Sequence, residues 1–327
     1  MRLTVTEIPG SLTTPFGGQD RAWAARARAA AAAFWVRAFF WVAEHAPRGI
    51  SAARGPLCRG AFRCSPSVRR GTRANARRLL GPGASARDVD GLARRILSSF
   101  YLACCDIGRS FSATREQLFG RVENIDGDEH YRAARAAGKG LIVVTAHMGS
   151  FEVGMAALRE RERAKIHVVF RRDPFERFER LRSGLRSRLG VEEAPVDDGW
   201  TVWMRLRDAL LADEVIVLQG DRVMPGQKGE PVPFLGGKML LPAGPVKMAL
   251  ATGAPIVPIF SVRTAGGKVR LFVEPAIYVE PVESNAAGAP HPALLQWAAV
   301  LERYVRAYPD QWLMLRPALC EDAEVAR

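Results

Sequence analysis

The sequence predicts an α/β fold in which a mostly parallel sheet is flanked by helices. Short, continuous apolar runs recur from residue 140 onward, and such runs are typical of strands buried on both faces. Helical stretches separate these runs, and alternating β and α segments favour parallel pairing. The 327 residues are enough for one large domain of this kind or for two small ones.

Each strand and helix is predicted from its own residue pattern. The apolar runs expected as central strands are Leu141–Ala146, Ile166–Phe170, Val215–Gln219 and Pro255–Ser261. Val269–Val273 alternates more between apolar and polar residues, so we expect it at an edge of the sheet. The helices expected around them are Phe151–Arg161, Phe175–Leu189, Trp200–Ala212, Gly244–Ala251 and Pro292–Ala307.

The first third of the chain differs from the rest in residue composition. It is rich in alanine and arginine, and Ala86–Ser110 carries apolar residues close to a 3.6-residue period, which predicts a helix. We therefore expect four parts along the chain. They are a loose lead at 1–20, a basic helical region at 21–120, an α/β core at 121–318 and a tail at 319–327.

The charge of the protein is concentrated in that first third. The chain has a net charge of +13, and residues 1–100 hold 17 arginines, no lysine and five acidic residues. A basic face of this kind attracts phosphates, whether on anionic lipid, on nucleic acid or on an acidic carrier protein. The five cysteines are odd in number and form no CxxC pair. They favour a reducing compartment and indicate neither a disulfide framework nor a zinc site.

An aromatic segment at Ala29–Ala43 is the candidate for membrane contact. It is 15 residues long and contains Arg37, whereas a bilayer span needs about 20 apolar residues. We interpret it as a helix lying in the membrane interface, with arginine side chains reaching the lipid phosphates. A buried core helix and a single span that tolerates Arg37 are the alternatives.

The segment Thr145–Glu152 carries the sharpest chemical pattern. His147 follows a predicted buried strand, and active sites of open α/β sheets lie at the carboxyl ends of strands. On one helix, His147 and Glu152 would point about 140° apart. They can converge only if His147 precedes the helix, which the Gly149–Ser150 turn permits. A carboxylate on one ring nitrogen would leave the other nitrogen free to take a proton. A structural histidine is the alternative.

Polar residues follow two other predicted strands. Arg171 comes directly after one of them, and Asp221 and Arg222 come just after another. A Gly/Pro-rich loop is expected at Gly229–Lys238. Solvated surface arginines would give the same pattern. No GxSxG elbow surrounds Ser150, which argues against a serine hydrolase.

Taken in order, these segments resemble the lipid A late acyltransferase family, the lauroyl/myristoyl transferases within the lysophospholipid acyltransferase superfamily. The resemblance covers about residues 21–318. Its segments are His147–Glu152, Phe170–Arg171, Asp221, Pro233–Gly236, Thr252–Pro258 and Tyr308–Trp312. Ser150 and Phe151 stand where the family often has asparagine and tryptophan, and Arg222 where it often has glutamine. These departures put in doubt that lipid A is the acceptor.

The resemblance implies a glycerolipid-acyltransferase-like fold at the cytoplasmic face of a bacterial inner membrane, anchored by the N-terminal aromatic helix. It also implies transfer of a fatty-acyl chain from acyl carrier protein or coenzyme A to a hydroxyl of a lipid or glycolipid. No metal or other cofactor is implied. The catalytic residues would be His147, as general base, and Glu152. The substrate-binding residues would be Gly149, Arg171, Asp221, Arg222, Phe234 and Gly236.

Two other classes of function remain open at this stage. A thioesterase-like hydrolase would use the same base with water as the acceptor. A non-catalytic basic protein would bind membranes or nucleic acid. Binding to nucleic acid would draw on the arginines between Arg69 and Arg78, but these lack the interleaved aromatic residues of a base-stacking platform.

Overall fold

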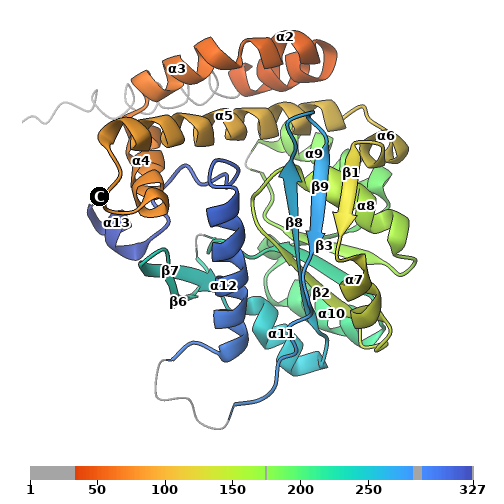
Figure 1. Ribbon diagram of the computed structural model, residues 1–327. Helices are drawn as coiled ribbons and strands as arrows, with labels where there is room; N and C mark the ends of the chain where they lie inside the picture. Colours follow the sequence, from red (N-terminus) through yellow and green to blue (C-terminus); the bar gives the residue numbers. More distant parts are fainter. Residues whose placement is uncertain (1–33, 174, 225, 283–288, 326–327) are drawn as a thin grey trace, which may run out of the picture.

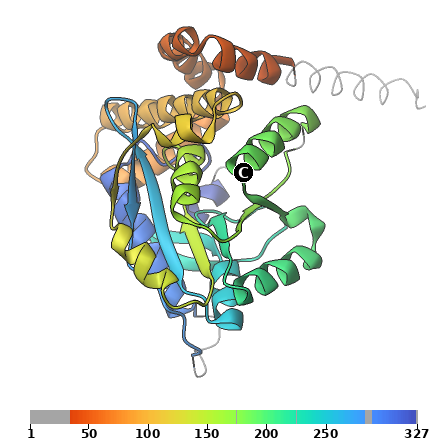
Figure 2. The same cartoon turned by 90° about the vertical axis from the view of Figure 1, so that its right-hand side faces the viewer.

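The computed structural model describes residues 34–173, 175–224, 226–282 and 289–325. Its centre is a seven-stranded sheet (Figures 1 and 2). The strands are β1 Val122–Asp126, β2 Leu141–Thr145, β3 Ile166–Phe170, β4 Glu192–Pro195, β5 Val215–Gln219, β8 Ile256–Arg263 and β9 Val269–Val273. The order across the sheet is β1-β9-β8-β2-β5-β3-β4. Neighbours from β8 to β4 are parallel, whereas β9 is antiparallel to β8.

The predicted central strands are confirmed, and the sheet edges are not where we expected them. β9 lies inside the sheet because β1 pairs with its outer side, so the prediction of an edge position is wrong. The sequence of β1, VENID, has no apolar run, and its middle residues are exposed. β4 also lacks an apolar run, because it begins with the exposed Glu192 and the half-buried Glu193, and only Ala194 and Pro195 are buried. Half-exposed edge strands lack the pattern by which buried strands are recognised.

Alternate side chains of the strands enter two separate cores. In β2, Leu141 and Val143 face one core, and Ile142 and Val144 face the other. The first core is covered by α6 Arg115–Phe119, α7 Asp128–Arg135, α8 Phe151–Arg161 and α9 Glu176–Leu189. The second core is covered by α10 Trp200–Leu211, α11 Gly244–Thr252 and α12 Pro292–Ala307.

A layer of helices lies across one end of the sheet (Figure 1). Residues 34–45 are helical and precede α2 Pro47–Ala52, α3 Arg54–Cys64, α4 Pro66–Leu80 and α5 Ala86–Ser110. The predicted start of α5 is confirmed, because the Ser85 hydroxyl accepts a hydrogen bond from the Asp88 N–H at 3.2 Å. The part of the aromatic segment before residue 34 lies outside the described residues. Across the described ranges, no helix combines the length and the apolar character needed to cross a membrane.

The Gly/Pro-rich segment is a β-hairpin rather than the loop we predicted. β6 Gly229–Phe234 pairs with β7 Gly237–Pro242 in antiparallel register. Pro231 and Pro233 are exposed while Val232 and Phe234 are buried, so the strand alternates in spite of its prolines. A two-stranded ribbon tolerates them because each of its strands has a free edge.

The chain returns after α12 to the helical layer. Asn75 of α4 donates to the carbonyl oxygens of Met314, at 3.0 Å, and Arg316, at 2.8 Å, and accepts from the Ala318 N–H at 2.9 Å. Gly71 allows this approach, since a Cβ there would lie 2.1 Å from the Leu315 carbonyl oxygen. The final helix, α13 Cys320–Val325, follows. The C-terminal segment is thereby fixed against both the helices and the core.

Candidate active site

The turn between β2 and α8, residues 146–150, holds the predicted histidine, and we call it the catalytic turn. Gly149 has a φ of +56°, and a Cβ at this position would lie 2.3 Å from the Ser261 carbonyl oxygen. Only glycine fits such a backbone so close to a neighbouring strand. The Ser261 hydroxyl also donates to the Met148 carbonyl oxygen at 2.9 Å. The turn is therefore packed closely against β8.

His147 is paired with Asp221. Its Nδ1 lies 2.6 Å from Asp221 Oδ1. β2 and β5 are parallel neighbours in which Thr145 is opposite Gln219, so the residues that follow the two strands meet at one edge of the sheet. The carboxylate favours the tautomer with hydrogen on Nδ1. Within the described part of the chain, Nε2 of His147 makes no hydrogen bond, so its lone pair is available to a substrate.

Asp221 is fully buried and is held from three sides. Besides His147, the Trp312 indole N–H donates to Oδ2 at 3.0 Å, and Arg222 Nη2 lies 3.6 Å from the same oxygen. Burial by itself raises the pKa of Asp221. The charges of His147 and Arg222, with the hydrogen bonds from His147 and Trp312, outweigh burial and hold that pKa well below its usual value. Asp221 is therefore ionised at neutral pH.

Glu152 is not the partner of His147, contrary to our prediction. It lies in the first turn of α8 and is buried, and within the described residues the ring hydrogen bond of His147 goes to Asp221 instead. Burial raises the pKa of Glu152, while the charges of Arg182 and Arg121 partly oppose that rise. Burial raises the pKa of Cys104 in α5, and the charge of Glu152 adds to that rise. The electrostatic neighbours of Glu152 are thus residues of other helices and of the segment before β1.

A cavity of about 440 Å³ opens beside His147. Part of its wall is apolar and includes Val169, Trp203, Ile216, Leu218 and Met248. The rest is cationic, with Arg171, Arg182, Arg222, Lys228 and Lys247. None of the described residues that line it is acidic. The cavity suits a molecule that has both an apolar chain and negative charges.

A second apolar cavity, of about 520 Å³, reaches Asp221 from the side of the C-terminal segment. It shares Arg222 and Met224 with the cavity at His147. Its apolar lining includes Phe100, Val223, Leu240, Met314 and Leu319. Two apolar spaces therefore flank the histidine–aspartate pair.

The predicted binding residues are only partly brought together. Arg171 and Arg222 line the cavity at His147, but Gly149 lines a different one. Phe234 and Gly236 line neither of the cavities at the histidine–aspartate pair. Phe234 is buried, and its ring packs against Trp312 with a centroid distance of 5.7 Å. Phe234 therefore contacts the site through Trp312, the residue that donates to Asp221.

Several residues of the site were not predicted from sequence. Trp312 was noted only as part of a C-terminal signature. Four further cavity residues lie in helices or loops, away from the ends of the predicted strands, so no sequence pattern marked them as part of a site. They are Arg182, Trp203, Lys228 and Lys247.

A histidine paired with a buried aspartate and facing an apolar and cationic cavity is an arrangement suited to proton transfer on an amphipathic, anionic substrate. Comparison with known proteins narrows this class. Residues 20–320 match the model of the bacterial lipid A biosynthesis acyltransferases, so the chain belongs to that family and the resemblance predicted from its motifs is confirmed.

Two similar proteins are both named phosphatidylinositol mannoside acyltransferases. The chain is 27% identical over 264 residues to a phosphatidylinositol mannoside acyltransferase of Mycobacterium tuberculosis strain H37Rv, covering 78% of each chain. It is 26% identical over 256 residues to a phosphatidylinositol mannoside acyltransferase of Mycolicibacterium smegmatis, covering 76% of this chain and 79% of that one. The chain is thus a member of a family of lipid and glycolipid acyltransferases.

Replacing Trp312 by phenylalanine tests whether this indole positions Asp221. The change keeps an aromatic ring against Phe234 and removes the hydrogen bond to a buried carboxylate, a bond of about 1.5–3 kcal/mol. We expect kcat for acyl transfer to fall about tenfold or more, with little change in KM.

Trp297 provides a matched control for that variant. Its indole N–H donates to the Gly220 carbonyl oxygen at 3.1 Å, next to Asp221 in the chain but to a neutral acceptor. Trp297→Phe should lower the melting temperature without a comparable loss of kcat. Equal losses of kcat in the two variants would show that Trp312 has a structural role alone.

Proposed function

We propose that this protein transfers a fatty-acyl chain from an acyl thioester to a hydroxyl of a phosphate-bearing glycolipid, with His147 as the general base. The observation that carries the proposal is the pairing of His147 Nδ1 with the buried, ionised Asp221. This pairing leaves Nε2 available to accept a proton from a substrate. Membership of the acyltransferase family supports the reaction class.

In this mechanism, the acceptor hydroxyl gives its proton to Nε2 of His147 as its oxygen attacks the thioester carbonyl. Asp221 stabilises the imidazolium that forms, because its charge lies 2.6 Å from Nδ1. The tetrahedral intermediate then collapses and the carbon–sulfur bond breaks. The imidazolium returns its proton to the departing thiolate, so the enzyme ends in its starting state.

The cavity at His147 supports an anionic thioester as the donor. Its apolar wall suits the acyl chain, and its five cationic side chains suit the phosphates of coenzyme A or of the phosphopantetheine arm of acyl carrier protein. The arginine-rich first third of the chain would also attract an acidic carrier protein to this enzyme.

The names of the relatives support a phosphoglycolipid as the acceptor. They are described as acting on phosphatidylinositol mannoside, a mannose-bearing phospholipid. We propose an acceptor of that chemical kind, a sugar hydroxyl on a phospholipid headgroup, in preference to lipid A. The departures from the lipid A family at Ser150, Phe151 and Arg222 agree with this preference.

We further propose that the protein lies at the cytoplasmic face of a bacterial inner membrane. The helix at 34–45 packs Phe39 against Tyr101 and Phe40 against Phe178, and it exposes Trp35 and Trp41. Aromatic side chains of this kind are favoured at the level of lipid headgroups.

The central test compares three single variants. We expect His147→Ala and Asp221→Asn to lose acyl transfer by roughly 100-fold or more, because one removes the base and the other removes its compensating charge. We expect Glu152→Gln to lose far less, because its carboxyl makes no hydrogen bond with His147. The assay measures transfer of labelled acyl chain from acyl-coenzyme A or acyl carrier protein to extracted glycolipid.

Far-ultraviolet circular dichroism of each variant is the folding control. Full transfer by His147→Ala would contradict the proposal. Glu152→Gln losing as much activity as Asp221→Asn, with its fold intact, would contradict the assignment of Asp221 as the orienting residue. Release of free fatty acid at the same rate with and without an acceptor would identify a thioesterase instead.

Membrane docking is tested by Trp35→Ser combined with Trp41→Ser. We expect this variant to lose most of its binding to anionic vesicles in a sedimentation assay, because two exposed indoles no longer enter the interface. Trp200→Ser with Tyr278→Ser removes aromatic rings that are equally exposed on other elements. Equal loss of binding by both pairs would contradict docking through the helix at 34–45.

A further inference from the structure

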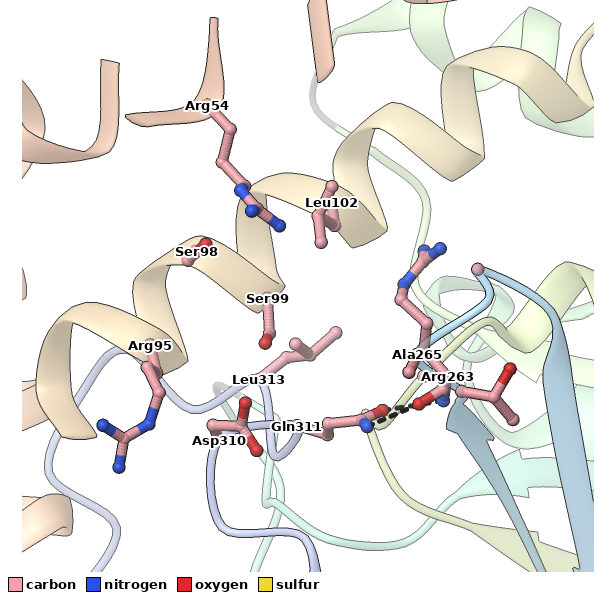
Figure 3. Close-up of a pocket in the computed structure, with 13 residues that line it drawn as sticks. Arg54, Arg95, Ser98, Ser99, Leu102, Arg263, Ala265, Asp310, Gln311 and Leu313 are labelled. Carbon is pink, nitrogen blue, oxygen red and sulfur yellow. Dashed lines mark hydrogen bonds between the residues drawn. The ribbon is translucent and has the colours of Figure 1, made fainter. Parts of the chain in front are cut away.

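A cavity of about 580 Å³ lies where the helical layer meets the core, apart from the cavity that holds His147 (Figure 3). Arg54 of α3 points into it from above, and Arg95, Ser98 and Ser99 of α5 line one side. The end of β8 and the segment after α12 complete the wall. Gly149 of the catalytic turn also lines this cavity.

Positive charge dominates this cavity. Among the described residues that line it, three are arginines (Arg54, Arg95 and Arg263) and one is acidic (Asp310). Within the described residues, Arg54 and Arg95 take part in no hydrogen bond or ion pair. Their charges are therefore available to a ligand.

Arg263 is bound to the protein, yet its charge is not fully compensated. Its guanidinium pairs with the buried Asp106. Arg121, at 3.0 Å, and Arg109, at 3.5 Å, contact the same carboxylate, so three guanidinium groups share Asp106, and only Arg121 has the charge of Glu152 nearby as well. Burial lowers the pKa of Arg263, and the charge of Arg54 lowers it further. An anion placed between Arg54 and Arg263 would relieve that repulsion.

The lining identifies the chemistry of the ligand. Guanidinium groups bind phosphate oxygens through paired hydrogen bonds, and the hydroxyls of Ser98 and Ser99 can donate to the same group. The cavity is larger than a phosphate ion needs, which leaves room for a group esterified to it. A phosphate ester fits these features.

The position of the cavity favours a lipid as the source of that ester. Its upper wall belongs to the helical layer that exposes Trp35, Trp41 and Leu57, the surface we assign to the membrane. The phosphates of the acyl donor have a separate set of cations in the cavity at His147.

We propose that this cavity binds the phosphate ester of a lipid headgroup through Arg54, Arg95 and Arg263. The site rests on the proposed function in one respect, since a headgroup held against Gly149 would belong to the acceptor. Binding is measured without turnover in full-length His147→Ala protein, so failure of the site and failure of the transfer reaction are separate results.

The experiment titrates three probes by calorimetry. The first is dihexanoyl phosphatidylglycerol below its micelle concentration, the second is dihexanoylglycerol, which has the same chains and no phosphate, and the third is coenzyme A. Each is titrated into His147→Ala protein with and without Arg54→Ala and Arg95→Ala. Arg48→Ala with Arg87→Ala is the matched control, because it removes two exposed arginines from the same helical layer, outside this cavity.

We expect the phospholipid to bind more tightly than dihexanoylglycerol. We expect Arg54→Ala with Arg95→Ala to weaken phospholipid binding at least tenfold, or about 1.4 kcal/mol. The control pair should weaken it much less, and unchanged affinity for coenzyme A would show that the variant is folded. Unchanged phospholipid binding, or an equal loss in the control pair, would overturn the proposal. Loss of coenzyme A binding alone would assign the cavity to the acyl donor and would also overturn it.

Discussion

The buried charge of Asp221 is the constraint on which the rest of the site depends. A carboxylate that is removed from water costs several kcal/mol unless cations and hydrogen-bond donors surround it. Here these groups come from three parts of the chain: His147 after β2, Arg222 after β5, and Trp312 after α12. The central parallel strands bring the first two together. The third requires the chain to return from α12, and the hydrogen bonds of Asn75 hold that return in place.

Two cavities open at the catalytic turn, one at His147 and one at Gly149. The C-terminal segment binds the turn directly, because the Leu313 N–H donates to the His147 carbonyl oxygen at 2.9 Å. Leu313 also lines the cavity near Asp221 and the arginine-rich cavity near Gly149. An apolar and cationic cavity lies beside His147, and a cationic cavity lies beside Gly149. A donor thioester and an acceptor headgroup could therefore reach one histidine from different directions.

Much of the fold could be predicted from sequence because its central elements depend on local pattern. The apolar runs of β2, β3 and β5 and the periodicity of α5 needed no distant information. β1 and β4 could not be predicted from sequence, because these edge strands are partly exposed and carry charged residues. The site was harder to predict. The place of His147 after a buried strand is visible in the sequence, but its partner Asp221 is 74 residues away, whereas local spacing points to the nearby Glu152. Trp312 depends on tertiary packing that no local pattern records.

The tautomer of His147 tests the central claim most directly. The protein has five histidines, and spectra of His147→Ala identify the signals of this one in protein labelled with ¹⁵N. At a pH where the imidazole is neutral, we expect hydrogen on Nδ1 and a free Nε2 in the wild type. Asp221→Asn should disturb this pattern and Glu152→Gln should preserve it. A pattern that changes with Glu152→Gln and survives Asp221→Asn would contradict the account.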